Sequence, residues 1–190
     1  TIGAQYAILG GIWSQHWTQA ATSNQFKDID SYNLTASSLN NPFDEMYAGA
    51  LNDYQFIIKK SEQSQDWFYF LTATVMKAYT MQVMVDLYDK VPYSQAFQGL
   101  DNLTPVYDDG DKVYAGLIAE IDNALSKDFT ASTNPTPGNR EIVFSGSVDN
   151  WKRFANTLKL KMYLRMINAK PTEAIAGINK LYTDKVNFLG

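Results

Sequence analysis

Residues 67–88 form the longest apolar stretch of the chain and constrain its fold more than any other feature. Hydrophobic side chains occur on every face of a helix drawn over this stretch, which predicts a helix buried between neighbouring elements. Thr, Lys, Gln and Asp residues interrupt the stretch, so a buried helix is favoured over a membrane span. Pro92 pushes Val91 out of the α-helical region, and the helix must therefore end just before these two residues.

Other segments also have helical periodicity. Between residues 43 and 58 the apolar side chains recur at spacings of three and four, which places them on one face of a helix. Similar stripes follow in residues 113–125, 151–166 and 175–182. The residue types at the segment starts predict where the helices begin. The expected starts are Asn41 as N-cap with Pro42 at the first helical position, Ser64 as the cap of the buried helix, Asp111 as a cap, Ser147 or Asp149 as a cap, and Pro171.

The connections between these segments are short, apart from residues 130–147, which are rich in Pro, Gly, Asn, Ser and Thr. Within this loop, residues 141–144 could make a short strand. Short connections place consecutive helices in antiparallel pairs, and stacked pairs of this length describe a TPR-like array. We therefore predict an all-α fold with long irregular loops. One helical domain is expected over 1–190, with a helix and loop in 1–40 and TPR-like helices in 41–190.

Composition excludes several functions. The net charge is −4, which argues against nucleic acid as a partner. The chain has no cysteine and one histidine, His16, so disulfides, cysteine metal sites and histidine metal clusters are excluded. The acidic run at 108–111 lacks the spacing and closing Glu of a calcium loop, and a turn explains it. No pattern implies a cofactor or a metal.

No catalytic pattern is evident either. Asp86 and Asp89 might form a pair for glycoside hydrolysis, but they lie three residues apart at the end of a helix. A structural role is favoured for both, with basic residues of the segment 151–166 as partners. We expect a protein that is not an enzyme.

The N-terminal forty residues begin as a helix and continue as a long polar loop. Trp13, Trp17 and Tyr32 border this loop, and Asn24 lies within it. Aromatic rings beside amide side chains suit sugar binding, because a pyranose has an apolar face to stack and hydroxyls to bond. These four residues are the candidate ligand-binding site. The alternative is that the rings belong to the core.

Three motifs in the chain resemble those of the SusD/RagB-like family. Residues 86–96, DLYDKVPYSQA, resemble the signature D-L-Y-G-x-V-P-Y-x-x-A. Residues 104–108, TPVYD, resemble T-P-x-Y-D, and residues 151–162, WKRFANTLKLKM, resemble the helix W-x-K-F-A-N-T/S-L-K-L-R. Asp89 stands where the family commonly has Gly, and Lys161 where Arg is usual.

This resemblance implies a non-catalytic lipoprotein on the outer face of the outer membrane of Bacteroidetes. Such proteins cover SusC-like TonB-dependent transporters and deliver glycans, or in some members peptides, to the pore. Family members are longer, so the chain resembles their TPR-bearing N-terminal portion, with the lipid anchor on a segment that this sequence does not contain. The ligand is an oligosaccharide or a peptide, and a pure helical-repeat interaction scaffold is a further alternative.

Overall fold

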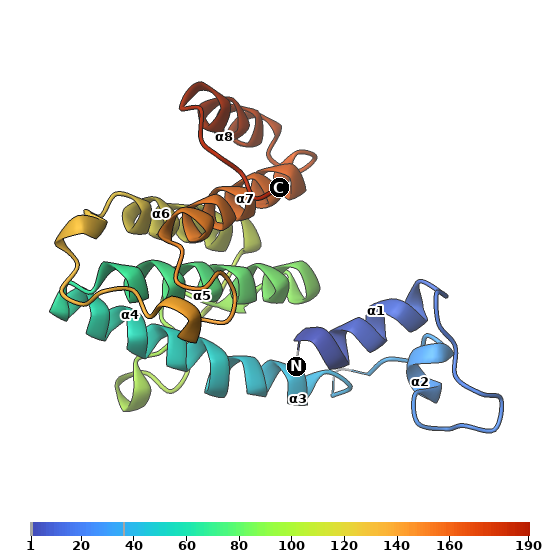
Figure 1. The fold of residues 1–190 in the computed structure, drawn as a ribbon. Coiled ribbons are helices and arrows are strands. Elements are labelled where there is room, and N and C mark those ends of the chain that lie inside the picture. The colour runs from blue at the N-terminus through green and yellow to red at the C-terminus, as the bar shows by residue number, and fades with distance from the viewer. Residues whose placement is uncertain (1, 36) are drawn as a thin grey trace. The chain divides into compact units, whose positions relative to one another are not determined.

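The structure is a computed structural model that describes residues 2–35 and 37–190. The chain divides into two compact units, Thr1–Leu51 and Asn52–Gly190. The single domain expected over 1–190 remains a prediction. Figure 1 shows the helices that make up both units.

The first unit consists of short helical segments joined by a long loop. Leu9, Ile12, Met46 and Leu51 are buried in it. Its elements are η1 (Ile2–Tyr6), α1 (Ala7–Trp13), α2 (Lys27–Asp30), α3 (Asn40–Asp44) and η2 (Glu45–Leu51). Because α3 begins at Asn40, after Leu39, the prediction of Asn41 as the N-cap was wrong. Pro42 still lies in the first turn, where a helix needs no backbone N–H donor.

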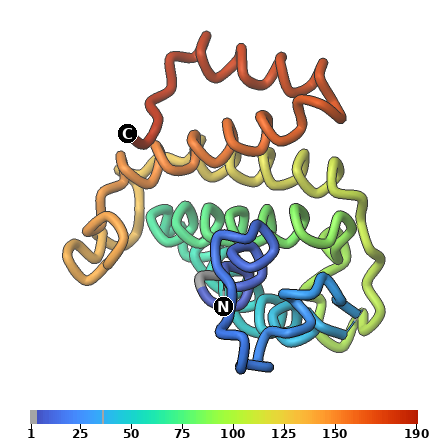
Figure 2. Tube along the Cα trace, turned by 90° about the vertical axis from the view of Figure 1, so that its right-hand side faces the viewer, coloured from blue at the N-terminus to red at the C-terminus, as the bar shows by residue number. Residues whose placement is uncertain are grey.

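The second unit is a stack of antiparallel helices. Its longer helices are α4 (Asn52–Ser64), α5 (Trp67–Tyr88), α6 (Gly110–Leu125), α7 (Val148–Met166) and α8 (Pro171–Thr183). Figures 1 and 2 show α5 in the middle of the stack, with α6 and α7 packed on it and α8 over α7. The connections carry the short 3-10 turns η3 (Gly99–Asp101), η4 (Phe129–Ala131) and η5 (Gly138–Arg140). The predicted all-α fold is confirmed.

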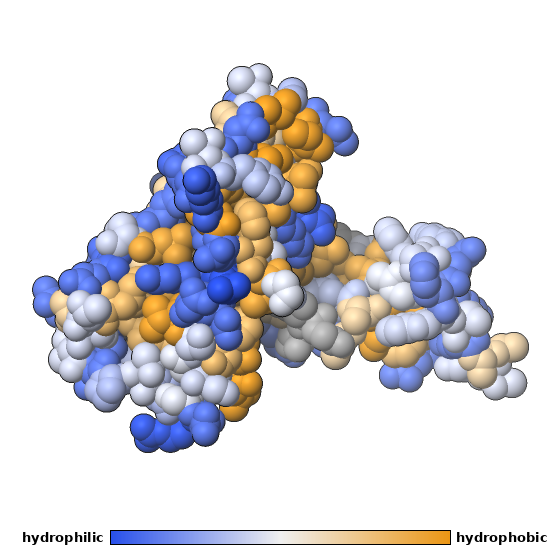
Figure 3. Space-filling view, turned by 45° about the horizontal axis from the view of Figure 1, so that its top comes forward, coloured by the Kyte–Doolittle hydropathy of each residue, from blue (hydrophilic) through white to orange (hydrophobic). Residues whose placement is uncertain are grey.

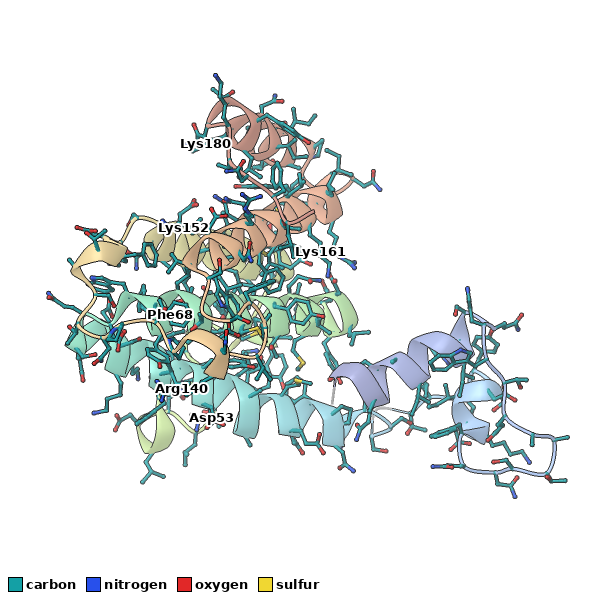
Figure 4. All side chains as sticks on the ribbon, viewed as in Figure 1. Asp53, Phe68, Arg140, Lys152, Lys161 and Lys180 are labelled. Atoms are coloured by element: carbon teal, nitrogen blue, oxygen red, sulfur yellow. The ribbon has the colours of Figure 1, made fainter. Side chains whose placement is uncertain are left out.

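Helix α5 is the core of this unit, as its sequence predicts. Leu71, Val75, Ala78 and Met81 have no exposed surface, and Phe68, labelled in Figure 4, is 2% exposed. Within the described residues, no helix combines the length and the apolar character that crossing a membrane requires. Helix α8, at the top of Figure 3, exposes apolar surface.

Two of the predicted helix starts in this unit were wrong. Ser64 is the last residue of α4, and its hydroxyl donates to the carbonyl of Lys60 at 3.0 Å. Helix α6 begins at Gly110, after Asp109, so Asp111 lies inside the first turn. There its carboxylate pairs with Lys170 at 2.9 Å, and an acidic residue in a first turn is favoured by the helix dipole.

The other two starts are confirmed. Ser147 precedes α7, and its hydroxyl accepts a hydrogen bond from the backbone N–H of Asn150 at 3.2 Å. Pro171 is the first residue of α8.

The expected strand at 141–144 was wrong, because these residues form turns. The Glu141 carboxylate accepts hydrogen bonds from the backbone N–H groups of Val143, Phe144 and Gly146 at 2.6–3.1 Å, which closes the loop on itself. A two-residue antiparallel pair occurs elsewhere. Strand β1 (Val91–Pro92) pairs with β2 (Tyr107–Asp108), with Val91 opposite Asp108 and Pro92 opposite Tyr107. This strand pair joins the 86–96 motif to the 104–108 motif.

Candidate functional site

The aromatic loop of the first unit contains the predicted ligand-binding residues. Trp13 is the last residue of α1, and its ring centroid lies 5.7 Å from that of Tyr32 at an angle of 43°. The Tyr32 hydroxyl donates to the Trp13 carbonyl at 3.0 Å. Trp13 is 42% exposed and Tyr32 is 53% exposed, so neither ring is in the core.

Trp17 is also exposed, at 56%, but it packs back on α1. A Cβ added at Gly11 would lie 2.5 Å from Cε3 of the Trp17 ring, and the Trp17 backbone N–H donates to the Gly11 carbonyl at 3.0 Å. Glycine is therefore needed at position 11 for this close approach. Among the described residues, no ring contact joins Trp17 to Trp13 or Tyr32.

Asn24 is exposed within the loop. Its side chain makes no hydrogen bond within residues 2–35 and 37–190. Two side chains tie the loop together: Gln19 Oε1 accepts from the Phe26 backbone N–H at 3.0 Å, and the Thr18 hydroxyl donates to Asp30 at 3.3 Å. The structure therefore brings Trp13 and Tyr32 together, while among the described residues no ring contact or hydrogen bond joins Trp17 or Asn24 to that pair. The ligand-binding role of all four remains a prediction.

His16, in the same loop, has a local partner. Its Nδ1 lies 2.8 Å from the Ser14 hydroxyl. In the part of the chain that the structure describes, no group of three His, Cys, Asp or Glu side chains could hold a metal ion.

Asp86, the first residue of the 86–96 motif, is the centre of a polar network. Its carboxylate lies 3.0 Å from the Arg165 guanidinium and accepts hydrogen bonds from the Tyr114 hydroxyl and the Gln82 amide. Burial, followed by the hydrogen bond to Asp86, raises the pKa of the Tyr114 hydroxyl above its usual range. The network joins α5, α6 and α7, and it confirms for Asp86 the predicted pairing with a basic residue of α7. Within the described residues, Asp89 makes no such pair.

The other basic residues of α7 have two kinds of partner. Arg153 pairs with Asp149 at 2.6 Å, and Lys159 pairs with Asp122. Lys152 and Lys161, both labelled in Figure 4, lie instead over the rings of Phe129 and Tyr79, with Nζ 4.3 and 5.6 Å from the centroids. Ring faces attract ammonium groups, a partner that the sequence did not indicate.

Residues 7–189 match the SusD-like family described as "Starch-binding associating with outer membrane". The chain belongs to this SusD-like family. No protein among those with curated descriptions matches the chain.

Solved structures of SusD-like proteins share the fold. A structure described as a chitin-binding protein superposes with a TM-score of 0.80 at 22% identity, over 97% of this chain and 39% of that one. A chitin-binding SusD homolog from Flavobacterium johnsoniae gives a TM-score of 0.67 at 25% identity, over 83% of this chain and 33% of that one. A SusD-like protein from Bacteroides thetaiotaomicron VPI-5482 gives 0.69 at 24% identity, over 85% and 34%. The chain thus spans between a third and two fifths of the length of these relatives.

The backbone geometry at Asp89 gives a reason for the glycine that we expected at this position of the 86–96 motif. Asp89 has φ = +62°, in the left-handed region that glycine adopts without steric cost. Its carbonyl oxygen lies 2.9 Å from where a Cβ on Gly110 would stand, so the chain also turns closely past the start of α6. With ψ = −61°, Asp89 lies outside the left-handed helical well, and the Lys90 backbone N–H donates to the Tyr88 carbonyl at 2.7 Å across it. This is the geometry of a γ-turn, which is strained for a residue other than glycine.

Proposed function

We propose that this SusD-like chain is the helical part of a non-catalytic, glycan-binding protein associated with the outer membrane. The observation that carries the proposal is the family match over residues 7–189, whose description names both starch binding and the outer membrane. Chitin binding, named for two of the structural relatives, agrees with a polysaccharide ligand.

The aromatic loop is the proposed contact with the oligosaccharide. Exposed rings of Trp13, Trp17 and Tyr32 offer flat apolar surface. The Asn24 amide, which makes no hydrogen bond among the described residues, offers a donor and an acceptor. Sugar rings expose C–H groups on one face and hydroxyls at the edge, so ring stacking combined with amide hydrogen bonds is complementary to them.

The proposed biological role is to pass the ligand to a SusC-like TonB-dependent transporter. In this role a lipid anchor holds the protein on the cell surface. Affinity purification of the full-length protein from outer membranes tests the partnership. Co-purification of a TonB-dependent transporter in stoichiometric amount is expected, and its absence after mild detergent extraction would contradict it.

Calorimetry on the full-length protein tests ligand binding, with maltooligosaccharides and chitooligosaccharides as probes. Replacing Trp13 and Trp17 together by Ala should weaken the binding of the preferred oligosaccharide by roughly a hundredfold, at about 1.5 kcal/mol for each lost ring. Tyr182→Ala is the matched control, because Tyr182 is 62% exposed and lies on α8. It should leave the affinity unchanged.

Two other functions predict different results. A peptide-binding protein of the same transporter type would bind members of a peptide library and none of the saccharides. A pure interaction scaffold would bind neither probe, and its transporter association would be unaffected by the double Trp replacement.

A further inference from the structure

A polar cleft lies in the second unit between α4, α5, α6 and the loop 93–98. It has an outer part of about 440 Å³ and an inner part of about 140 Å³. Gln55, Lys77 and Glu120 line both parts, so the two parts meet at these residues. The outer wall is completed mainly by Lys59, Tyr93 and Gln98, and the inner wall by Glu62, Thr74 and Asn123.

Two of the three shared residues, Lys77 and Glu120, form an ion pair. Lys77 is only 6% exposed, and its Nζ lies 2.9 and 3.0 Å from the two carboxylate oxygens of Glu120. The Tyr93 hydroxyl donates to the same carboxylate at 2.8 Å. Burial, and then the negative charge of Glu120, raises the pKa of Tyr93 well above its usual range, so this hydroxyl keeps its proton.

Around this pair, several polar groups have no partner. Within the described residues, the side chains of Gln55, Lys59, Gln98 and Asn123 make no hydrogen bond or ion pair. The Thr74 hydroxyl, on the inner wall, has less than 1 Å² of exposed surface and no hydrogen-bond partner, and Thr74 as a whole is 2% exposed. A buried hydroxyl without a partner has lost its hydrogen bonds to water, so a polar group bound beside it would be stabilised.

The charges of the cleft define the ligand class. Lys59 and Lys77 balance Glu62 and Glu120, so the lining is neutral overall. A carboxylate ligand would be repelled by the negative charges of Glu62 and Glu120. An apolar ligand would leave the side-chain amides of the cleft without hydrogen-bond partners. A hydroxyl can donate to Glu120 while it accepts from an ammonium or an amide, which matches this mixture of groups.

We propose that this cleft is a second binding site, which takes one ring of a neutral, hydroxyl-rich ligand. Gln55 and Gln98 bond its outer hydroxyls, Glu120 accepts from one of them, and an inner hydroxyl bonds Thr74 after a small movement of the side chains that cover it. The site goes beyond the proposed function, because it is lined by α4, α5 and α6 and uses none of the residues of the aromatic loop.

Saturation-transfer NMR with glucose and N-acetylglucosamine on the full-length protein tests the site. The double variant Gln55→Ala/Gln98→Ala should weaken binding of the monosaccharide at least tenfold. The control Gln63→Ala, on the exposed side of α4, should not weaken it, nor should the double Trp13/Trp17 replacement. Three results would overturn the proposal. They are no monosaccharide signal in the wild type, an unchanged signal in the Gln double variant, and a lost signal in the Trp double variant. Equal competition by glucuronate overturns the neutral ligand class.

Thr74→Val tests the inner part without disturbing its shape. The variant removes the unpartnered hydroxyl, so the empty protein should melt at a higher temperature while its affinity for glucose falls severalfold. Thr74→Ser keeps the hydroxyl and should bind as the wild type does. Wild-type affinity in Thr74→Val would overturn the placement of the ligand over this residue. Loss of oligosaccharide binding in the Trp variant is a separate readout, so failure of this site and failure of the proposed function are distinguishable.

Discussion

The Arg165 guanidinium on α7 lies 3.0 Å from the Asp86 carboxylate near the end of α5. Tyr114 on α6 donates to the same carboxylate. The Asp86 side chain therefore links α5, α6 and α7, although Asp86, Tyr114 and Arg165 are at least 28 residues apart in sequence.

Asp86→Ala should lower the free energy of unfolding by about 1–3 kcal/mol, because it leaves the buried Tyr114 hydroxyl without an acceptor. Arg165→Met should cost less than about 1 kcal/mol, since the Arg165 side chain is 48% exposed and its charge is solvated. Urea unfolding followed by circular dichroism measures both. Asp184→Ala, which removes a surface pair with Lys180, is the control and should have no measurable effect. Equal losses for Asp86→Ala and its control would contradict the network.

Replacing the two members of the Lys77–Glu120 pair should have unequal effects. Glu120→Ala leaves a buried ammonium, 7% exposed at the side chain, without its partner and should destabilise the chain by about 3–5 kcal/mol. Lys77→Met removes that charge and leaves a carboxylate that is 34% exposed, so it should cost less than about 1 kcal/mol. Thermal melting of the two variants decides the order. Similar losses would show that the burial of Lys77 does not control the energetics.

Gly116→Ala should destabilise α6 although alanine favours helices. Its Cβ would lie 2.5 Å from Cε1 and from the hydroxyl oxygen of the Tyr93 ring, which is anchored by its bond to Glu120. Displacing the ring should cost about 1–3 kcal/mol. Gly10→Ala on α1 is the matched control, because nothing lies within 4 Å of its Cβ, and it should stabilise by about 0.5–1 kcal/mol. A gain of stability in both variants would contradict the contact.

Asp108 should make stability depend on pH in acid. Its carboxylate accepts from the backbone N–H and the hydroxyl of Ser94, both at 2.8 Å, and these bonds hold its pKa below the usual 3.8. Because the folded pKa is below the unfolded one, the stabilisation is complete above about pH 3.8 and is lost as the pH falls through the folded pKa. The stability gap between wild type and Asp108→Asn, measured by urea unfolding, should therefore narrow below this pH.

Ser94→Ala serves as the intermediate case. It removes the hydroxyl donor and keeps the backbone donor, which is the largest cause of the lowered pKa. The pH dependence of its unfolding free energy should lie between those of the wild type and Asp108→Asn. The role of Asp108 would be contradicted if the difference in unfolding free energy between wild type and Asp108→Asn stayed constant from neutral pH to pH 3.

Helix interiors were predicted well, and their ends less well. The apolar character of 67–88 and the proline at 92 fixed α5 and its end, because both act within a few residues of the chain. Starts at Ser147 and Pro171 followed from the same local rules. At Ser64 and Asp111 the residue type was equally suitable, but the side chains bond Lys60 and Lys170 instead of capping the next helix.

The candidate sites divide in the same way. The aromatic loop could be noticed in the sequence because its rings and amides lie close together along the chain. The polar cleft could not, since Lys77 and Glu120 are 43 residues apart and a lone Lys in an apolar helix gives no indication of its partner. Tyr93 lies within a recognised motif, yet its bond to Glu120 depends on how the loop folds over α6.

By itself, the sequence determined the helices, their antiparallel order and the family, because periodicity, proline and motif spacing are properties of neighbouring residues. Tertiary structure alone decided which carboxylate meets which cation, how closely the turn at Asp89 passes the start of α6, and where polar groups of the described residues remain without partners. Those outcomes depend on contacts between distant segments, and such contacts are fixed only when the helices pack.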